Sequence, residues 1–188
     1  MERGDYDSAK EKILTALSYP ENLGEGRLEG TKDNNLYYTL GLIYEAMGRD
    51  KDAADCYDKA TKGKMEPAGV MYYYDQPADM ILFMGMAKRK QGLTEEADKI
   101  FNGLIDYADE HINDTFKMDY FAVSLPDMSV FDADMTQRNR LHCFYLRGLG
   151  SLGLLRYEEA INAFEEVLKA DPNHQNAAIY RNMVIQQQ

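Results

Sequence analysis

The chain of 188 residues has no tryptophan, two cysteines and five prolines. Cys56 and Cys143 are too far apart for the paired spacing of a zinc site and are too few for a disulfide framework. Basic residues are scarce as well: 21 stand against 32 acidic ones, a formal net charge of −11. Because nucleic acids and anionic lipids bind basic surfaces, we expect neither as a partner. No apolar run reaches the length of about 20 residues that a membrane-spanning helix needs, so we expect no membrane insertion.

The rest of the composition is that of a folded protein. Hydrophobic residues make up 45% of the chain and charged residues 28%, which is too apolar for a disordered segment. A chain of this length buries roughly 70% of the surface that it exposes when unfolded. It therefore needs neither a metal nor a disulfide to hold its core together.

The chain contains an internal repeat of small and large residues. In three segments a glycine precedes an alanine by 12 residues, and the alanine precedes an aromatic residue by 4; the triplets are Gly41, Ala53 and Tyr57, then Gly85, Ala97 and Phe101, then Gly148, Ala160 and Phe164. The N-terminal segment has only the second half of this pattern, in Ala9, Ile13 and Ala16.

This spacing predicts antiparallel helix pairs, in which a small residue on each helix allows close approach and the large residues fill the space beside it. A glycine inside a helix costs about 1 kcal/mol relative to alanine, so its recurrence indicates a packing role. Gly48 and Gly92 are placed to end the first helix of a pair, and Asp50 or Thr94 to cap the second. We predict an all-α fold, a right-handed superhelix of such pairs.

The pattern resembles the tetratricopeptide repeat. That family has a leucine, a glycine and a tyrosine on the first helix and an alanine and an aromatic residue on the second, with a proline after it. The segment with the fullest match has Tyr37, Leu40, Gly41, Tyr44, Ala53, Tyr57 and Ala60, and the last has Phe144, Gly148, Ala160, Phe164 and Pro172. Tryptophan is missing from every copy, Lys88 and Ser151 replace the tyrosine, and Arg147 replaces the leucine.

We predict one repeat domain over residues 1–188. It consists of a half-repeat at 4–18, full repeats at 34–62, 78–106 and 141–170, and a C-terminal capping helix at 174–188. Since a half-repeat leaves an apolar face without a partner, we expect this chain to be the C-terminal part of a longer one.

The repeats are separated by long insertions. The alanines at 9, 53, 97 and 160 stand 44, 44 and 63 residues apart, against about 34 for the repeat itself. The excess falls in residues 19–33, 63–77 and 107–136. Residues 71–74 and 118–125 are aromatic and apolar, so we expect them to fold back onto the helices.

Several segments at 19–24, 67–80 and 119–127 are similar to the C-terminal repeat region of large multidomain bacterial proteins. In those proteins a domain of unknown function, related to carbohydrate-active modules, precedes the repeats. The resemblance implies an association with glycan metabolism and assigns no chemistry to these residues.

The candidate chemical motifs all have a more ordinary interpretation. Residues 148–153 spell the dinucleotide-binding string G-x-G-x-x-G, but they fall inside a predicted helix and not after a strand. Asp127, Asp132 and Asp134 lack the spacing of a calcium loop. His142 has no nucleophile beside it to activate. We therefore predict no catalytic residue, no metal ligand and no cofactor, and a chain that is not itself an enzyme.

The resemblance also implies a binding surface. In this family the first helices line a concave groove, to which each contributes four side chains. Carried over by register, the groove residues are Asn35, Tyr38, Leu42, Glu45, Asp79, Leu82, Met86, Arg89, His142, Tyr145, Leu149 and Leu152. Tyr38 and Leu42 stand where the chaperone-binding members carry the lysine and asparagine of a carboxylate clamp, so we do not expect that specificity.

Three hypotheses for function follow. The first is a non-enzymatic scaffold that binds a protein, a peptide or its own upstream domains through this groove. The second is an accessory module of a carbohydrate-active enzyme, which contributes its loops to a neighbouring active site. The third is self-association through the exposed half-repeat.

Overall fold

The computed structural model describes residues 5–18, 31–69, 76–115 and 134–186, and within these ranges its regular structure is entirely α-helical. The helices are α1 (Tyr6–Ala16), α2 (Asn34–Ala46), α3 (Asp50–Ala60), α4 (Asp79–Lys90), α5 (Thr94–His111), α6 (Met135–Gly153), α7 (Tyr157–Ala170) and α8 (Gln175–Ile185). The all-α fold of paired helices predicted from the sequence is confirmed.

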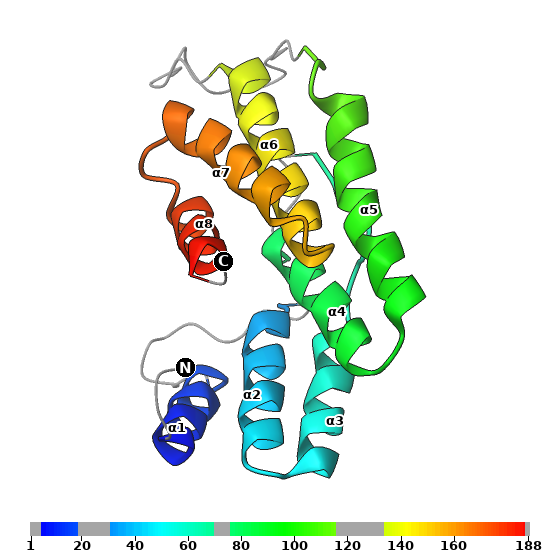
Figure 1. Cartoon of the computed structure of the whole chain (residues 1–188), viewed down its shortest axis with the longest axis vertical. Coiled ribbons are helices and arrows are strands. Elements are labelled where there is room, and N and C mark those ends of the chain that lie inside the picture. Colours follow the sequence, from blue (N-terminus) through cyan, green and yellow to red (C-terminus); the bar gives the residue numbers. More distant parts are fainter. Residues whose placement is uncertain (1–4, 19–30, 70–75, 116–133, 187–188) are drawn as a thin grey trace, which may run out of the picture. The chain divides into compact units, whose positions relative to one another are not determined.

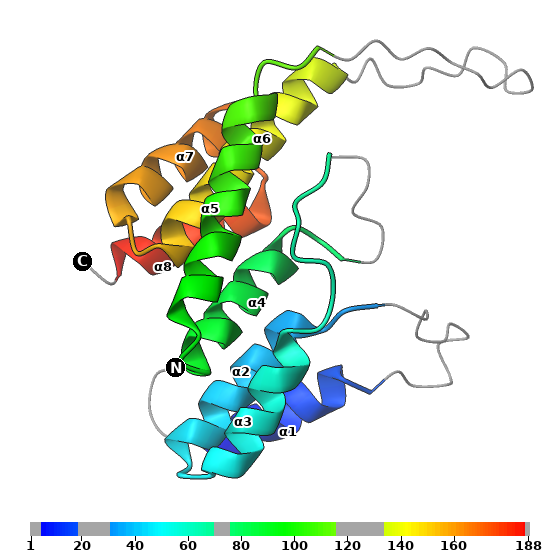
Figure 2. The same cartoon turned by 90° about the vertical axis from the view of Figure 1, so that its right-hand side faces the viewer.

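The chain divides into two compact units. One comprises Met1–Ala68 and Tyr73–Phe101, and the other Gly69–Tyr72 and Asn102–Gln188, so that α5 begins in the first and ends in the second. Within the first unit α2 packs against α3, α1 and α4, and within the second α7 packs against α6 and α8. Figures 1 and 2 show α2 beside α3 and α6 beside α7, each as an antiparallel pair. A single repeat domain stays a prediction from the sequence.

Each pair is closed by a turn with one residue in the left-handed region. Gly48 has φ +70° and Gly92 has φ +80°. The amide of Arg49 donates to the carbonyl of Tyr44 at 2.8 Å, and that of Leu93 to the carbonyl of Lys88 at 3.0 Å. These bonds satisfy carbonyls at the end of the first helix, as expected for glycine caps.

The turn between α6 and α7 has the same bonding with a different residue. Leu155 stands seven residues after Gly148, as Gly48 does after Gly41, and it has φ +62°. The amide of Arg156 donates to the carbonyl of Ser151 at 2.8 Å. A leucine therefore occupies a backbone conformation that favours glycine.

The predicted helix caps at Asp50 and Thr94 are wrong. Both residues are the first of their helices, and the N-cap of α3 is Arg49. Arg49 makes no side-chain capping bond; its Nε donates instead to the carboxylate of Asp52 at 2.7 Å. In the tight turn at Gly48, the residue just before the helix is Arg49, whose side chain has no acceptor for the first helix amides. Asp50 instead supplies a negative charge in the first turn, where the helix dipole favours it.

The glycines of the repeat lie where two helices cross. A Cβ added to Gly41 would come within 2.5 Å of the Tyr57 ring, and one added to Gly148 within 2.5 Å of the Phe164 ring. Gly85 faces Phe101 in the same way. All three rings are buried. The close approach predicted from the spacing is confirmed at each full pair.

The long connections leave from anchored helix ends. The side-chain amide of Asn34 donates to the carbonyls of Ala60 (2.7 Å) and Lys62 (2.9 Å) at the end of α3. That of Asn139 donates to the carbonyl of His111, the last residue of α5, at 2.7 Å. Because α5 continues to 111 and α6 starts at 135, part of the insertion predicted at 107–136 is helical. Residues 71–74 and 118–125 lie outside the described residues, so their predicted packing onto the helices stays a prediction. At the end of the connection after α3, the side-chain oxygen of Gln76 accepts the amide of Lys64 at 2.9 Å.

The two end helices differ in burial. No residue of α1 is buried, although the helix packs against α2. In α8, Ala177, Tyr180 and Val184 are buried. His174 precedes α8, and its Nδ1 accepts the amide of Ala177 at 3.1 Å. Self-association through α1 stays a prediction.

Candidate functional site

The first-helix face of the first unit is apolar and partly open. Tyr38 is buried between Tyr57, with ring centroids 5.9 Å apart, and Phe83, at 5.8 Å. Around this cluster lie hydrophobic side chains that are only partly buried: Tyr37, Leu42, Tyr44, Phe83 and Met86. Leu42 of α2 and Met86 of α4 occupy equivalent repeat positions. Of the predicted groove residues, these two are the apolar ones that stay accessible in this unit.

Glu45, at the end of α2, connects three helices of this unit. Its carboxylate accepts the hydroxyl of Tyr57 at 2.6 Å and the ammonium of Lys90 at 2.8 Å. These two hydrogen bonds lower the pKa of Glu45. Burial and the same carboxylate raise the pKa of Tyr57 well above its ordinary value. Glu45 is exposed but bonded within the protein.

Arg89 holds the equivalent place on α4. Its guanidinium pairs with Asp98 at 2.5 Å and lies 5.0 Å from the centre of the Phe101 ring. Asp79 and Leu82 of the same helix are buried, whereas Asn35 of α2 is half-buried. The polar groove residues of this unit are therefore bonded or partly covered, and the accessible surface lies over Leu42 and Met86.

The predicted groove residues of α6 belong to the second unit. Tyr145 is buried, with its ring 4.6 Å from His174, 6.0 Å from Phe164 and 6.5 Å from Tyr180. Leu149 and Leu152 are also buried, and His142 is half-buried. The capping segment of α8 thus covers Tyr145.

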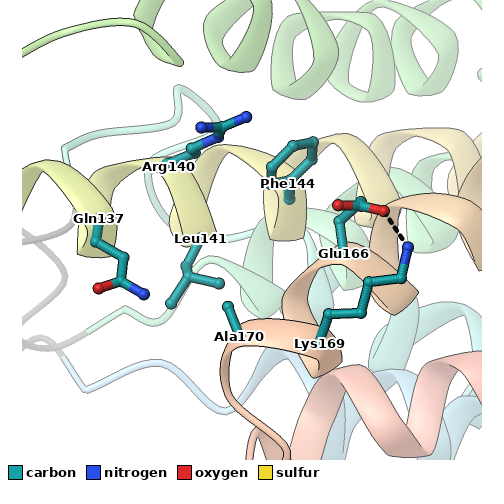
Figure 3. Close-up of a pocket in the computed structure, with 7 residues that line it drawn as sticks. All are labelled: Gln137, Arg140, Leu141, Phe144, Glu166, Lys169 and Ala170. Carbon is teal, nitrogen blue, oxygen red and sulfur yellow. Dashed lines mark hydrogen bonds and ion pairs between the residues drawn. The ribbon is translucent and has the colours of Figure 1, made fainter.

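A cleft that the sequence analysis did not predict lies between α6 and α7 (Figure 3). It consists of two adjoining hollows of about 280 and 430 Å³, which share Phe144, Glu166 and Lys169. Gln137, Arg140, Leu141 and Ala170 complete the first hollow, and Arg147, Glu159, Asn162, Ala163 and Glu165 the second.

Two arginines lie close to the aromatic ring in this cleft. The guanidinium carbons of Arg140 and Arg147 are 5.8 and 5.9 Å from the centre of the Phe144 ring. Arg147 is also paired with Asp109 of α5, and Lys169 with Glu166. The spacing Arg140-x3-Phe144-x2-Arg147 places all three on one helix face. The shared face can be read from the sequence, but the cleft beside it also needs the wall that α7 provides.

The two cysteines are buried inside the helix pairs. Burial raises the pKa of the Cys143 thiol to about 11 and raises that of Cys56 as well. Thiols held protonated in this way are poor nucleophiles and poor metal ligands. Among the residues that the structure describes, no three of histidine, cysteine, aspartate or glutamate cluster as a metal site would require.

Two of the helix pairs match the model of a known sequence family. The family model of the tetratricopeptide repeat matches residues 35–62, which contain α2 from its second residue on and all of α3. The same model matches residues 143–174, which contain most of α6 and all of α7. Both matches contain the glycine that crosses an aromatic ring.

These two matches support a tetratricopeptide-repeat protein. The α4–α5 pair, which lies between the two matches in the sequence, has the same crossing of a glycine and an aromatic ring. Tetratricopeptide repeats generally mediate contacts between proteins and are generally not catalytic. The predicted link to multidomain bacterial proteins with carbohydrate-active modules does not follow from these matches and stays a prediction. None of the helices in the described ranges is long and apolar enough to cross a membrane.

Proposed function

We propose that this chain is a scaffold that binds a protein or peptide through the first-helix face of its first unit. The observation that supports it most directly is the pair Leu42 and Met86. They occupy equivalent positions on α2 and α4 and remain partly exposed over the buried ring of Tyr38. An apolar stripe across neighbouring first helices suits the non-polar side chains of a bound segment.

The flanks of this stripe are polar. Glu45 and Lys90 form an ion pair that links α2 to α4 at 2.8 Å, and Arg89 pairs with Asp98. Paired charges at the edge contribute little affinity by themselves but disfavour partners with the wrong charge pattern. Methionine adapts its shape to different apolar side chains at low cost. We therefore expect an apolar segment to occupy the stripe.

A photo-crosslinking amino acid at position 86 tests this proposal. The full chain would be exposed to an extract of its source cells, and the captured protein would be identified, purified and titrated against the chain. We expect Met86→Glu to weaken the binding of that purified partner by at least tenfold, because it places a charge in the apolar stripe.

Ile179→Glu is the matched control. Ile179 is 51% exposed on α8, so the substitution adds the same charge to an accessible apolar position elsewhere. Circular dichroism would show that both variants keep their helices. A purified partner that binds Met86→Glu as tightly as the unchanged chain would contradict the proposal.

A further inference from the structure

Helix α8 begins at a histidine. His174 is its N-cap residue, and the ring Nδ1 accepts the amide of Ala177 at 3.1 Å. Serine, threonine, asparagine and aspartate are the usual residues at this position, because a side-chain oxygen accepts one of the free amides of the first turn. Here a ring nitrogen takes the place of that oxygen.

This hydrogen bond depends on the protonation state of the ring. A ring nitrogen accepts a hydrogen bond only while it carries no proton, and both nitrogens of the charged imidazolium are donors. The free amides at the start of a helix also carry a partial positive charge, which repels an imidazolium. Protonation of His174 therefore removes one capping bond and places a positive charge at a position that disfavours it.

No acidic side chain of α8 or α6 offsets the added charge. The first turn of α8 has no acidic residue, and Arg181 is the one charged residue of that helix. Helix α6 contains no aspartate or glutamate. The side chain that faces His174 from α6 is Tyr145, with ring centroids 4.6 Å apart, and tyrosine is uncharged at neutral and acidic pH.

The acidic residues that precede His174 are already bonded to other groups. The carboxylate of Asp171, in the segment between α7 and α8, accepts the amide of Asn173 at 3.0 Å. Glu166 of α7 is paired with Lys169, in the last turn of the same helix. These two are the nearest acidic residues in the sequence, and we expect them to compensate a charged His174 only weakly, because exposed pairs contribute little.

Helix α8 covers part of the first-helix face of the second unit. It packs against α7 (Figure 1), and Tyr180 stacks on Phe164 with ring centroids 5.9 Å apart. Tyr145, which the repeat register places on the first-helix face, is buried beside His174 and Tyr180. The amide that His174 caps belongs to Ala177, which is fully buried. A loosened first turn of α8 would therefore uncover Tyr145.

We infer that His174 makes α8 a pH-sensitive cover over Tyr145. The uncharged ring caps α8, and the cap is lost as the pH falls through the range of about 8 to 5 in which histidine takes up a proton. Because the neutral form is the stabilising one, its contribution is full at the alkaline end of that range and is lost at the acidic end. This cover belongs to the second unit and not to the Leu42–Met86 stripe, so it goes beyond the proposed function.

Hydrogen exchange of the full chain at about pH 7.5 and about pH 5 tests this inference. The measured rates would be corrected for the intrinsic chemical rate at each pH, which gives protection factors. We expect the protection of the α8 amides to fall at least about fivefold at the lower pH, since the capping bond is lost and the charge is repelled. The helices of the first unit serve as the internal reference, because that unit contains no histidine.

His174→Asn is the decisive variant. Asparagine is among the strongest N-cap residues and takes up no proton in this range. We expect this variant to keep the neutral-pH protection of α8 within about twofold and to lose the pH dependence. His111→Asn is the matched control: it removes a histidine of the same unit that bonds Asp114 and does not cap α8, so it should keep the pH dependence.

Two outcomes would overturn the inference. One is protection of α8 that is the same at both pH values in the unchanged chain. The other is an equal fall in His174→Asn and in the unchanged chain, which would assign the effect to other groups. If circular dichroism shows that His174→Asn loses its helices, His174→Ser, which supplies another strong N-cap without a titrating group, decides in its place.

Discussion

Single residues decide how closely the helices of a pair approach. The aromatic ring of the second helix lies directly on a glycine of the first, in Gly41, Gly85 and Gly148 alike. The crossing of α2 and α3 adds a polar contact, because its ring is a tyrosine whose hydroxyl reaches Glu45. Small changes at these positions therefore alter packing in a fully buried layer.

Gly148→Ala is expected to destabilise the protein by about 1–3 kcal/mol, because the new methyl group would overlap the buried Phe164 ring. Gly103→Ala is the control. It lies inside α5 with nothing within 4 Å of the added Cβ, so it should gain up to about 1 kcal/mol from helix propensity. Urea unfolding measures both, and equal effects would contradict the packing argument.

Leu155→Gly is expected to stabilise the protein by about 0.5–1 kcal/mol. The substitution relieves a leucine at φ +62°, and its side chain is 59% exposed, so little buried area is lost. The reciprocal change Gly92→Ala should destabilise by about 1 kcal/mol through the backbone alone, since φ is +80° and the added Cβ meets nothing. Thermal unfolding tests both expectations: the midpoint temperature should rise in Leu155→Gly and fall in Gly92→Ala, relative to the unchanged chain.

At the scale of helices, the repeat pattern predicted the pairs because its signal is local. Glycine, alanine and aromatic residues recur at fixed spacings within each pair, so Gly85 and Phe101 could be matched without knowing anything else about the fold. The extra turns of α5 and α6 were missed because residues 107–111 and 135–140 lie outside the repeat unit.

The candidate site was less predictable. Whether Tyr145 is accessible depends on α8, which covers it through His174 and Tyr180. The cleft beside Phe144 depends on how α6 and α7 lie together, and no spacing within one helix encodes that. The register of the repeat identified which residues share a helix face, but it did not identify which of their side chains stay accessible to solvent.

Glu45 links α2, α3 and α4, and its contribution should depend on pH. The pKa of its carboxyl is lowered in the folded protein, so the ionised form adds stability above the ordinary carboxyl pKa and loses it as the pH falls through the lowered value. Glu45→Gln should cost under about 1 kcal/mol at pH 7, because the pair is exposed. Urea unfolding at about pH 2 should show no difference between the variant and the unchanged chain.

At the scale of the whole molecule, the two compact units are expected to respond separately to mutation. Repeat proteins derive their stability from each unit and its immediate neighbours. Hydrogen exchange followed by mass spectrometry should show that Gly41→Ala lowers amide protection in α2 and α3 more than in α6 and α7. Gly148→Ala should show the reverse. Uniform loss of protection in both variants would indicate a single cooperative unit.

The anchoring of helix ends by Asn34 and Asn139 has a consequence for evolution: it affects how freely the long connections can change in length and sequence. Each amide fastens the carbonyl end of a second helix to a neighbouring first helix, at the point where a long connection departs. Lengthening or replacing that connection would leave the fastened stems in place, at a cost in loop entropy of only about 0.6 kcal/mol per doubling of length. New sequences could thus be grafted between α5 and α6, whose ends at this connection Asn139 joins, while these helices keep their registration.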